Sequence, residues 1–114
     1  MASGRLLVVA SDNDIRQSLV FAFEAEGFEV TARERPPTMA WMQQRRFDCT
    51  VLDQNALGGE AYESIAFCIK AHPVVLMAAR PHNWLAEWVS QVVVTPSADN
   101  ALVTAVRLAI QIQT

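Results

Sequence analysis

The chain has 114 residues and a mass of 12.6 kDa, which is enough for one domain with a hydrophobic core and too little for two. Hydrophobic residues make up 52% of the sequence and charged residues 18%, a balance that excludes a disordered chain, so we expect one folded domain over residues 1–114. The net charge of −3 disfavours nucleic acid as a partner, and no apolar run approaches the ~20 residues of a membrane span, so we expect a cytoplasmic protein without membrane contact.

The first half of the chain predicts two strands, each followed by a helix. Residues 6–10 form a short apolar run typical of a strand buried on both faces of a parallel sheet, and the polar cluster after it predicts a helix start. That helix is expected to end at Gly27, because a left-handed C-terminal cap favours glycine. A second strand is predicted over residues 28–32, and Pro36 and Pro37 are expected to open the second helix.

The second half repeats this alternation. A third strand is predicted over residues 47–53, and it ends on the carboxylate of Asp53. The helix over residues 60–71 is expected to bury Ile65, Ala66 and Ile69. Two further strands are predicted over residues 74–79 and 92–94, with a short helix over residues 81–90 between them. A last helix, capped by Ser97, is predicted over residues 97–113.

Five predicted strands alternate with five predicted helices, which is the pattern of an α/β fold. Parallel strands need crossover helices, and those crossovers are right-handed, so we expect an open doubly wound sheet of the flavodoxin-like type with strand order 2-1-3-4-5. The ligand crevice of such a sheet lies at the carboxyl ends of the strands.

Only one strand end in this crevice carries a carboxylate, Asp53. The other strand ends carry uncharged side chains, at Ala10, Ser11, Ala78 and Thr95. Paired acid/base catalysis needs two titratable groups with separated pKa values, and no Gly-rich phosphate loop is present, so we expect no enzymatic activity. Cys49 and Cys68 belong to no CxxC pair and are expected to be buried thiols without a metal or disulfide role.

Several segments together carry a family likeness. They are the first strand and helix start at 7–16, the helix-to-strand passage at 24–30, the third strand at 47–53, Leu57-Gly58, and Val94-Thr95-Pro96. In these segments the whole chain resembles the receiver domain of two-component response regulators, in which the last two motifs commonly read Pro-Gly and Val-Lys-Pro. The resemblance implies a signalling domain whose aspartate accepts a phosphoryl group from a histidine kinase, with Mg²⁺ held by an acidic pair, that aspartate and a backbone carbonyl.

The resemblance places the phospho-acceptor on Asp53 and the carbonyl ligand on Asn55. The remaining pocket positions of the family fall on residues of the wrong type: the acidic pair on Ala10 and Ser11, the hydroxyl on Ala78, the lysine on Thr95 and the aromatic switch on Val92. Mg²⁺ and the lysine offset the charge repulsion of phosphoryl transfer, so this pocket reads as degenerate. We expect no metal site and no cofactor, with Mg²⁺ required only if Asp53 is phosphorylated.

Two charged residues near this pocket have simpler expected roles. Asp12 is expected to cap the first helix, and Arg80 to be a solvated surface charge, although each is near enough in sequence to replace a lost pocket residue.

The last two helices carry more apolar surface than a core needs. The last helix has an inward stripe and a second apolar stripe of Ala101, Ala105, Leu108 and Ile112, and Trp84 and Trp88 share a face of the fourth helix. In receivers the face formed by the fourth helix, fifth strand and fifth helix commonly binds partners. We therefore predict an interaction face of Trp84, Trp88, Val92, Leu108 and Ile112.

The sequence thus predicts a receiver-like domain that acts as a protein-interaction module independently of phosphorylation, or with weak phosphorylation. Its expected partners are a histidine kinase, an output domain or a second copy of the chain. The first alternative is a working phospho-acceptor that uses Asp53 with a histidine kinase and Mg²⁺. The second is a flavodoxin-like enzyme or small-ligand binder that uses the uncharged crevice.

Overall fold

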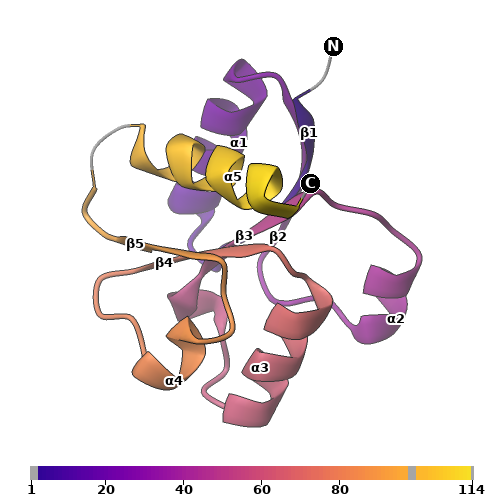
Figure 1. Cartoon of the computed structure of the whole chain (residues 1–114), viewed down its shortest axis with the longest axis vertical. Coiled ribbons are helices and arrows are strands. Elements are labelled where there is room, and N and C mark those ends of the chain that lie inside the picture. The colour runs from indigo at the N-terminus through magenta and orange to yellow at the C-terminus, as the bar shows by residue number, and fades with distance from the viewer. Residues whose placement is uncertain (1–2, 98–99, 114) are drawn as a thin grey trace.

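Five parallel strands form a single sheet in the computed structural model of the chain, which describes residues 3–97 and 100–113 (Figure 1). The strand order is β2-β1-β3-β4-β5, and all four neighbouring pairs are parallel. Both the sheet type and the strand order confirm the prediction. The strands are β1 (Gly4–Val9), β2 (Phe28–Arg33), β3 (Cys49–Asp53), β4 (Val74–Ala78) and β5 (Gln91–Val94).

Helices cover both faces of the sheet, with α1 and α5 on one side and α3 and α4 on the other (Figure 1). The side with α3 and α4 also carries α2, whose Met42 packs in the same core cluster as residues of those helices. The two faces are covered unequally, since two helices of 13 residues lie on one and helices of 5, 10 and 4 residues on the other. The helices are α1 (Asn13–Ala25), α2 (Met39–Gln43), the short 3-10 helix η1 (Gln54–Ala56), α3 (Ala61–Lys70), α4 (Asn83–Ala86) and α5 (Ala101–Gln113).

The hydrophobic core has two halves, which share the central strands as a common wall. On β1, Leu6 and Val8 belong to the half under α1 and α5, whereas Leu7 and Val9 belong to the half under α2, α3 and α4. All four side chains are completely buried. A strand buried on both faces needs a continuous apolar run, which is why the sequence of β1 shows no polar alternation.

The boundaries of α1 match the prediction, but the start of α2 does not. An oxygen of the Asp12 carboxylate accepts the Ile15 N–H at 3.0 Å and caps α1, and Gly27 follows this helix with a φ of +92°. Helix α2 begins at Met39 instead of at the prolines, because the Thr38 hydroxyl accepts the Trp41 N–H at 3.2 Å and sets the first turn.

The buried face of α3 also differs from the prediction. Ser64, Phe67 and Cys68 are buried, whereas Ala66 and Ile69 are exposed and Ile65 is half-buried. The predicted face was wrong because Phe67, the larger side chain, packs into the core and rotates Ile69 toward solvent.

The last two helices are shorter than predicted. Helix α4 is a single turn that ends at Ala86, so Trp88 lies beyond it. Helix α5 begins at Ala101, and the Asn100 carbonyl accepts a hydrogen bond from the Thr104 N–H at 3.0 Å. The predicted cap at Ser97 depends on residues 98–99, which lie outside the described residues. Among the helices of residues 3–97 and 100–113, none has the length and apolar character needed to cross a membrane.

Candidate functional site

Asp53 is the last residue of β3 and lies at the carboxyl edge of the sheet, with 5% of its surface exposed. One of its carboxylate oxygens accepts the Asn55 N–H at 3.0 Å, which caps the short helix η1. The structure therefore gives this carboxylate a local structural role, and it faces a partly buried environment instead of open solvent.

The structure brings the predicted pocket positions together around Asp53. In the sheet register Val9 pairs with Leu52, so Ala10 is beside the end of β3, and Ala78 ends the neighbouring strand on the other side. The Thr95 N–H donates to the Ala78 carbonyl at 3.0 Å, which brings Thr95 to the same edge. Ala10 and Ala78 are buried, Thr95 is half-buried, and Ser11 and Asn55 are exposed.

A cation that sequence reasoning missed lies at the end of β1. One terminal nitrogen of Arg16 donates to the carbonyl oxygens of Ala10 and Ser11 at 2.9 and 3.3 Å, and the other donates to the Asn13 side-chain oxygen at 2.8 Å. The resemblance placed an acidic pair at Ala10 and Ser11, and the structure places a guanidinium group there instead. The signal in the sequence was the spacing of Arg16 from Asn13, three residues apart in the first turn of α1, which brings the two side chains together.

A second missed residue, Gln54, directly follows Asp53 and holds the loop between β4 and α4. Its side-chain nitrogen donates to the Arg80 carbonyl at 2.9 Å, and its side-chain oxygen accepts the His82 N–H at 2.9 Å. Both ends of the amide are therefore bonded to one loop. We call this pair of hydrogen bonds the Gln54 latch. No short-range pattern in the sequence reveals it, because the partners are far from Gln54 along the chain.

The residues around Asp53 do not fit a Mg²⁺ site. In residues 3–97 and 100–113 no group of three or more His, Cys, Asp or Glu side chains is arranged to hold a metal. Ser11 and Asn55 line a hollow of about 440 Å³ whose lining also includes Glu60 and Glu63 but not Asp53. Asp53 is the one carboxylate among the strand ends at this edge. A strongly hydrated dication needs more anionic ligands than this, and the bound guanidinium of Arg16 adds a repulsive charge.

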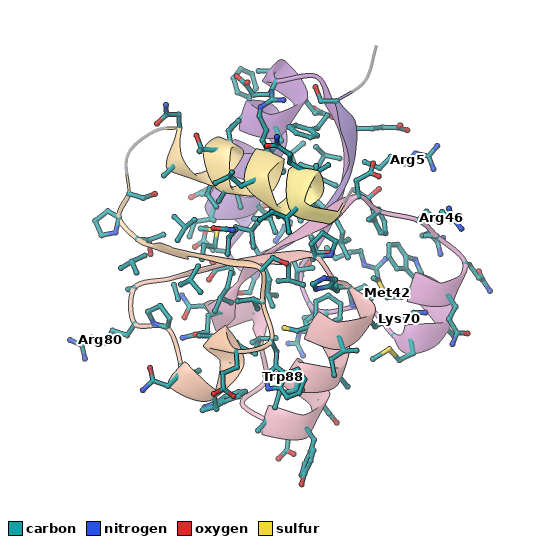
Figure 2. The ribbon with its side chains drawn as sticks, in the orientation of Figure 1. Arg5, Met42, Arg46, Lys70, Arg80 and Trp88 are labelled. Carbon is teal, nitrogen blue, oxygen red and sulfur yellow. The ribbon has the colours of Figure 1, made fainter. Side chains whose placement is uncertain are left out.

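Arg80 does not replace the lysine that the family carries. It is exposed, and Figure 2 shows its side chain pointing away from the molecule. Within the part of the chain that the structure describes, the ion pairs are Arg5 with Glu29 and Arg107 with Glu26, so Asp53 pairs with no described cation. The expectation that Arg80 is a surface charge is consistent with this placement.

The predicted interaction face is only partly continuous. A hollow of about 540 Å³ runs along β5 and α5, and both Val92 and Leu108 line it. Trp84, Trp88 and Ile112 are exposed but lie outside this lining, and Trp84 stacks on His82 with ring centroids 5.2 Å apart. Ala105, predicted in the second apolar stripe, is buried, so that stripe was wrong at this position; α5 turns Ala105 toward the core together with Val106 and Ala109.

The two thiols are buried on opposite sides of the sheet, Cys49 under α1 and α5 and Cys68 under α2, α3 and α4. Burial raises the pKa of Cys49 from 9.0 to about 12 and that of Cys68 to about 11. Neutral, buried thiols are poor nucleophiles and poor metal ligands, so neither cysteine belongs to the candidate site.

Solved structures with the same fold cover 96–98% of the chain. Full-length FixJ from B. japonicum aligns with a TM-score of 0.75 and 22% identity over 97% of this chain, which spans 59% of FixJ. The chemotaxis protein CheY4 of Vibrio cholerae aligns with a TM-score of 0.76 and 19% identity over 96% of this chain and 98% of its own. The receiver domain of Francisella response regulator 1452 aligns with a TM-score of 0.79 and 16% identity over 98% of this chain and 100% of its own.

Sequence comparison adds no further likeness, since no protein-family model and no curated protein matches the chain. The structural likeness holds at 16–22% identity and agrees with the strand order β2-β1-β3-β4-β5. The chain therefore has the fold of response regulator receiver domains.

Proposed function

We propose that the chain is a receiver-type module of two-component signalling that works through protein contacts and does not depend on phosphorylation of Asp53. The observation that carries the proposal is the set of side chains around that aspartate. Ala10, Ala78 and Thr95 lie at the neighbouring strand ends, so no second carboxylate and no lysine supports the transfer of a phosphoryl group. Transfer to a carboxylate brings negative charges together and needs such groups.

The Gln54 latch supports the same proposal. A switch that responds to a phosphoryl group needs a loop with two positions and a group that prefers one of them. Here the loop after β4 is bonded at both the Arg80 carbonyl and the His82 N–H, and the strand before it ends on Ala78, which has no hydroxyl. These two hydrogen bonds hold the loop in the absence of a phosphoryl group, which supports the proposal.

The surface that supports protein contacts is the hollow along β5 and α5. Val92 and Val94 of the edge strand and Leu108 of α5 line it, and their exposed fractions are 39%, 56% and 44%. Three large apolar side chains so exposed around one hollow are typical of a protein-binding surface. We propose a second copy of the chain as its occupant, with a histidine kinase or an output domain as the other partners to be tested.

Intact-mass measurement after incubation with acetyl phosphate and Mg²⁺ tests the independence from phosphorylation. We expect no phosphoryl adduct on the folded chain. The control is Asp53→Asn, which keeps the size of the side chain and removes the acceptor. An adduct that forms on the natural chain and is absent from Asp53→Asn would establish the working phospho-acceptor instead.

Sedimentation equilibrium tests the apolar hollow. We expect self-association that Leu108→Asp weakens by about tenfold or more, because a buried charge opposes apolar contact. Ile69→Asp is the matched control, since Ile69 is 56% exposed on α3 and lies outside the hollow. A chain that stays monomeric at all concentrations would exclude the second copy as the occupant.

A further inference from the structure

A second candidate surface lies beside β2 and α2, away from Asp53. A hollow of about 580 Å³ is lined there by Arg5, Arg45, Arg46 and Phe47, among others. A second hollow of about 450 Å³ shares Arg45, Arg46 and Phe47 and adds Lys70. We call the two hollows together the basic groove. Figure 2 shows Arg5 and Arg46 pointing outward on the same side of the molecule, opposite to the side from which Arg80 points.

The positive charge of the basic groove is not neutralised by the carboxylates near it. The Glu29 carboxylate pairs with the Arg5 side chain at 3.3 Å, and the Asp48 carboxylate accepts the Arg5 backbone N–H at 2.7 Å. The Asp48 carboxylate lines the second hollow and keeps its negative charge, since a backbone N–H carries no net charge, so the groove cations outnumber it. Among the residues that the structure describes, Arg45, Arg46 and Lys70 have no carboxylate within ion-pair distance. Three exposed cations therefore lie together on a chain whose net charge is −3.

Aromatic side chains hold part of this charge in place. The Arg45 guanidinium lies 4.1 Å from the centre of the Trp41 ring and donates to the Trp41 carbonyl at 3.2 Å. The Trp41 ring stacks on Phe47, with centroids 5.9 Å apart, and the Arg33 guanidinium lies 5.0 Å from the Trp41 ring. A guanidinium stacked in this way keeps most of its donors free and loses little entropy when a carboxylate binds.

The backbone beside the groove suits an extended segment. Strand β2 is at the edge of the sheet and has β1 as its one neighbour, so its outer N–H and C=O groups are available for pairing. Glu29 and Thr31 of β2 line the larger hollow, and Thr31 is exposed because α2 has only five residues and leaves this part of the sheet uncovered. A segment added to an edge strand gains backbone hydrogen bonds and directs alternate side chains to one face.

We propose that the basic groove binds an acidic, extended segment of a protein partner, which pairs along β2 and places carboxylates on Arg45 and Arg46, with Lys70 in the adjoining hollow as a further cation. The charge distribution favours this partner over nucleic acid or an anionic membrane. A long polyanion would meet the net negative charge of the rest of the molecule, whereas a short acidic segment meets only the local cations. The proposal goes beyond the proposed function and uses a different surface, so either can fail without the other.

Titration of the isotopically labelled full chain with a peptide probe tests the proposal by NMR. The probe is a short capped peptide in which glutamate alternates with threonine. The control peptide has lysine in place of each glutamate. We expect amide shifts at Thr31, Arg46 and Phe47 with the glutamate peptide alone, and an affinity that falls as salt is added.

Two exposed arginines give a matched pair of variants, because both changes alter the net charge equally and neither residue has a described ion pair. Arg46→Glu is expected to lower the peptide affinity by about tenfold or more, and Arg80→Glu by less than about twofold. Lys70→Glu is a second groove variant, and circular dichroism checks that each variant is folded.

Three outcomes would overturn the proposal. The first is the absence of groove shifts with the glutamate peptide. The second is an equal loss of affinity in Arg46→Glu and Arg80→Glu, which would show that net charge alone matters. The third is tighter binding of single-stranded oligothymidylate, or of vesicles containing phosphatidylserine, through Arg46, which would assign the groove to nucleic acid or to a membrane.

Discussion

The crevice around Asp53 and the basic groove use their polar side chains in opposite ways. At the crevice Arg16 and Gln54 donate to backbone carbonyls, so their hydrogen bonds are made inside the molecule. At the groove Arg46 and Lys70 point no donors at a described acceptor and face solvent. The difference shows that charge at a crevice is not evidence of a ligand site by itself: what matters is whether the donors of each cation are already bonded.

Raising the pH should destabilise both halves of the core, because each contains one buried thiol, and should have the largest effect on stability. The pKa of Cys49 is about 12 and that of Cys68 about 11 in the folded chain, both above the ordinary 9.0. A raised pKa in the folded state gives stability below pH 9 that is lost as the pH rises toward these values. At one pH unit above the unfolded pKa, each thiol is expected to lower the free energy of unfolding by about 1.4 kcal/mol.

Urea unfolding between pH 8 and about 10 measures this loss. The control is the double variant Cys49→Ala/Cys68→Ala, in which the decline with pH should be shallower, since other groups still titrate there. Identical slopes for the two chains would show that the buried thiols do not contribute.

Removing the charged end of an arginine should separate the two regions. Arg16→Met keeps the stem of the side chain but loses the bonds to Ala10, Ser11 and Asn13, and we expect the free energy of unfolding to fall by about 2 kcal/mol. Arg46→Met should change it by less than about 0.5 kcal/mol. Denaturant unfolding of both variants measures the two free energies of unfolding. Similar losses in Arg16→Met and Arg46→Met would contradict the difference between the crevice and the groove.

Removing the Gln54 latch should have a smaller and more local effect. Gln54→Ala loses two hydrogen bonds to an exposed loop and is expected to cost about 1 kcal/mol. The His82 amide donates to the Gln54 side-chain oxygen, so without that acceptor its hydrogen should exchange faster with solvent, which NMR exchange measurements can follow. Gln43→Ala, at an exposed glutamine that lines the basic groove and lies away from the loop after β4, is the control. Unchanged exchange at His82 would show that the loop is held by other contacts.

The smallest effect on stability is expected at Glu29. Its ion pair with Arg5 is exposed, so Glu29→Gln should change the free energy of unfolding by less than about 0.5 kcal/mol. The same change frees Arg5 and should strengthen binding of the glutamate peptide by about twofold to threefold. Calorimetric titration of the two chains checks this, and weaker binding by Glu29→Gln would remove Arg5 from the groove's cations.

Sequence reasoning predicted the sheet well because each strand is marked by a short apolar run in its own segment of the sequence. Apolar runs such as residues 6–10, which overlap β1, predicted the number of strands, and the helices between them predicted the strand order through right-handed crossovers. The helices on the thinly covered face were less predictable. Pro36 and Pro37 are compatible with a helix start, but the Thr38 cap begins α2 only at Met39. The spacing of Trp84 and Trp88 suggested a longer α4, but that helix is one turn that ends at Ala86.

The candidate site was predictable in its positions and not in its contacts. The strand ends identified Asp53, Ala10 and Ala78, because the topology alone brings those residues to one edge. The contacts of Gln54 and the groove shared by Arg5 and Arg46 join segments that are distant in sequence. Only the packed structure brings such segments together, so no local pattern carries that information.

The alternation of side chains along β1 has a thermodynamic consequence. Leu6 and Val8 pack in one half of the core, and Leu7 and Val9 pack in the other. Neither half can unfold without disrupting β1, which would expose buried side chains of the other half. On heating, the two halves should therefore unfold together in one calorimetric peak, with a calorimetric enthalpy equal to the van't Hoff enthalpy. Unequal cover by the helices would then alter how readily each side opens locally, without dividing the domain into separately melting parts.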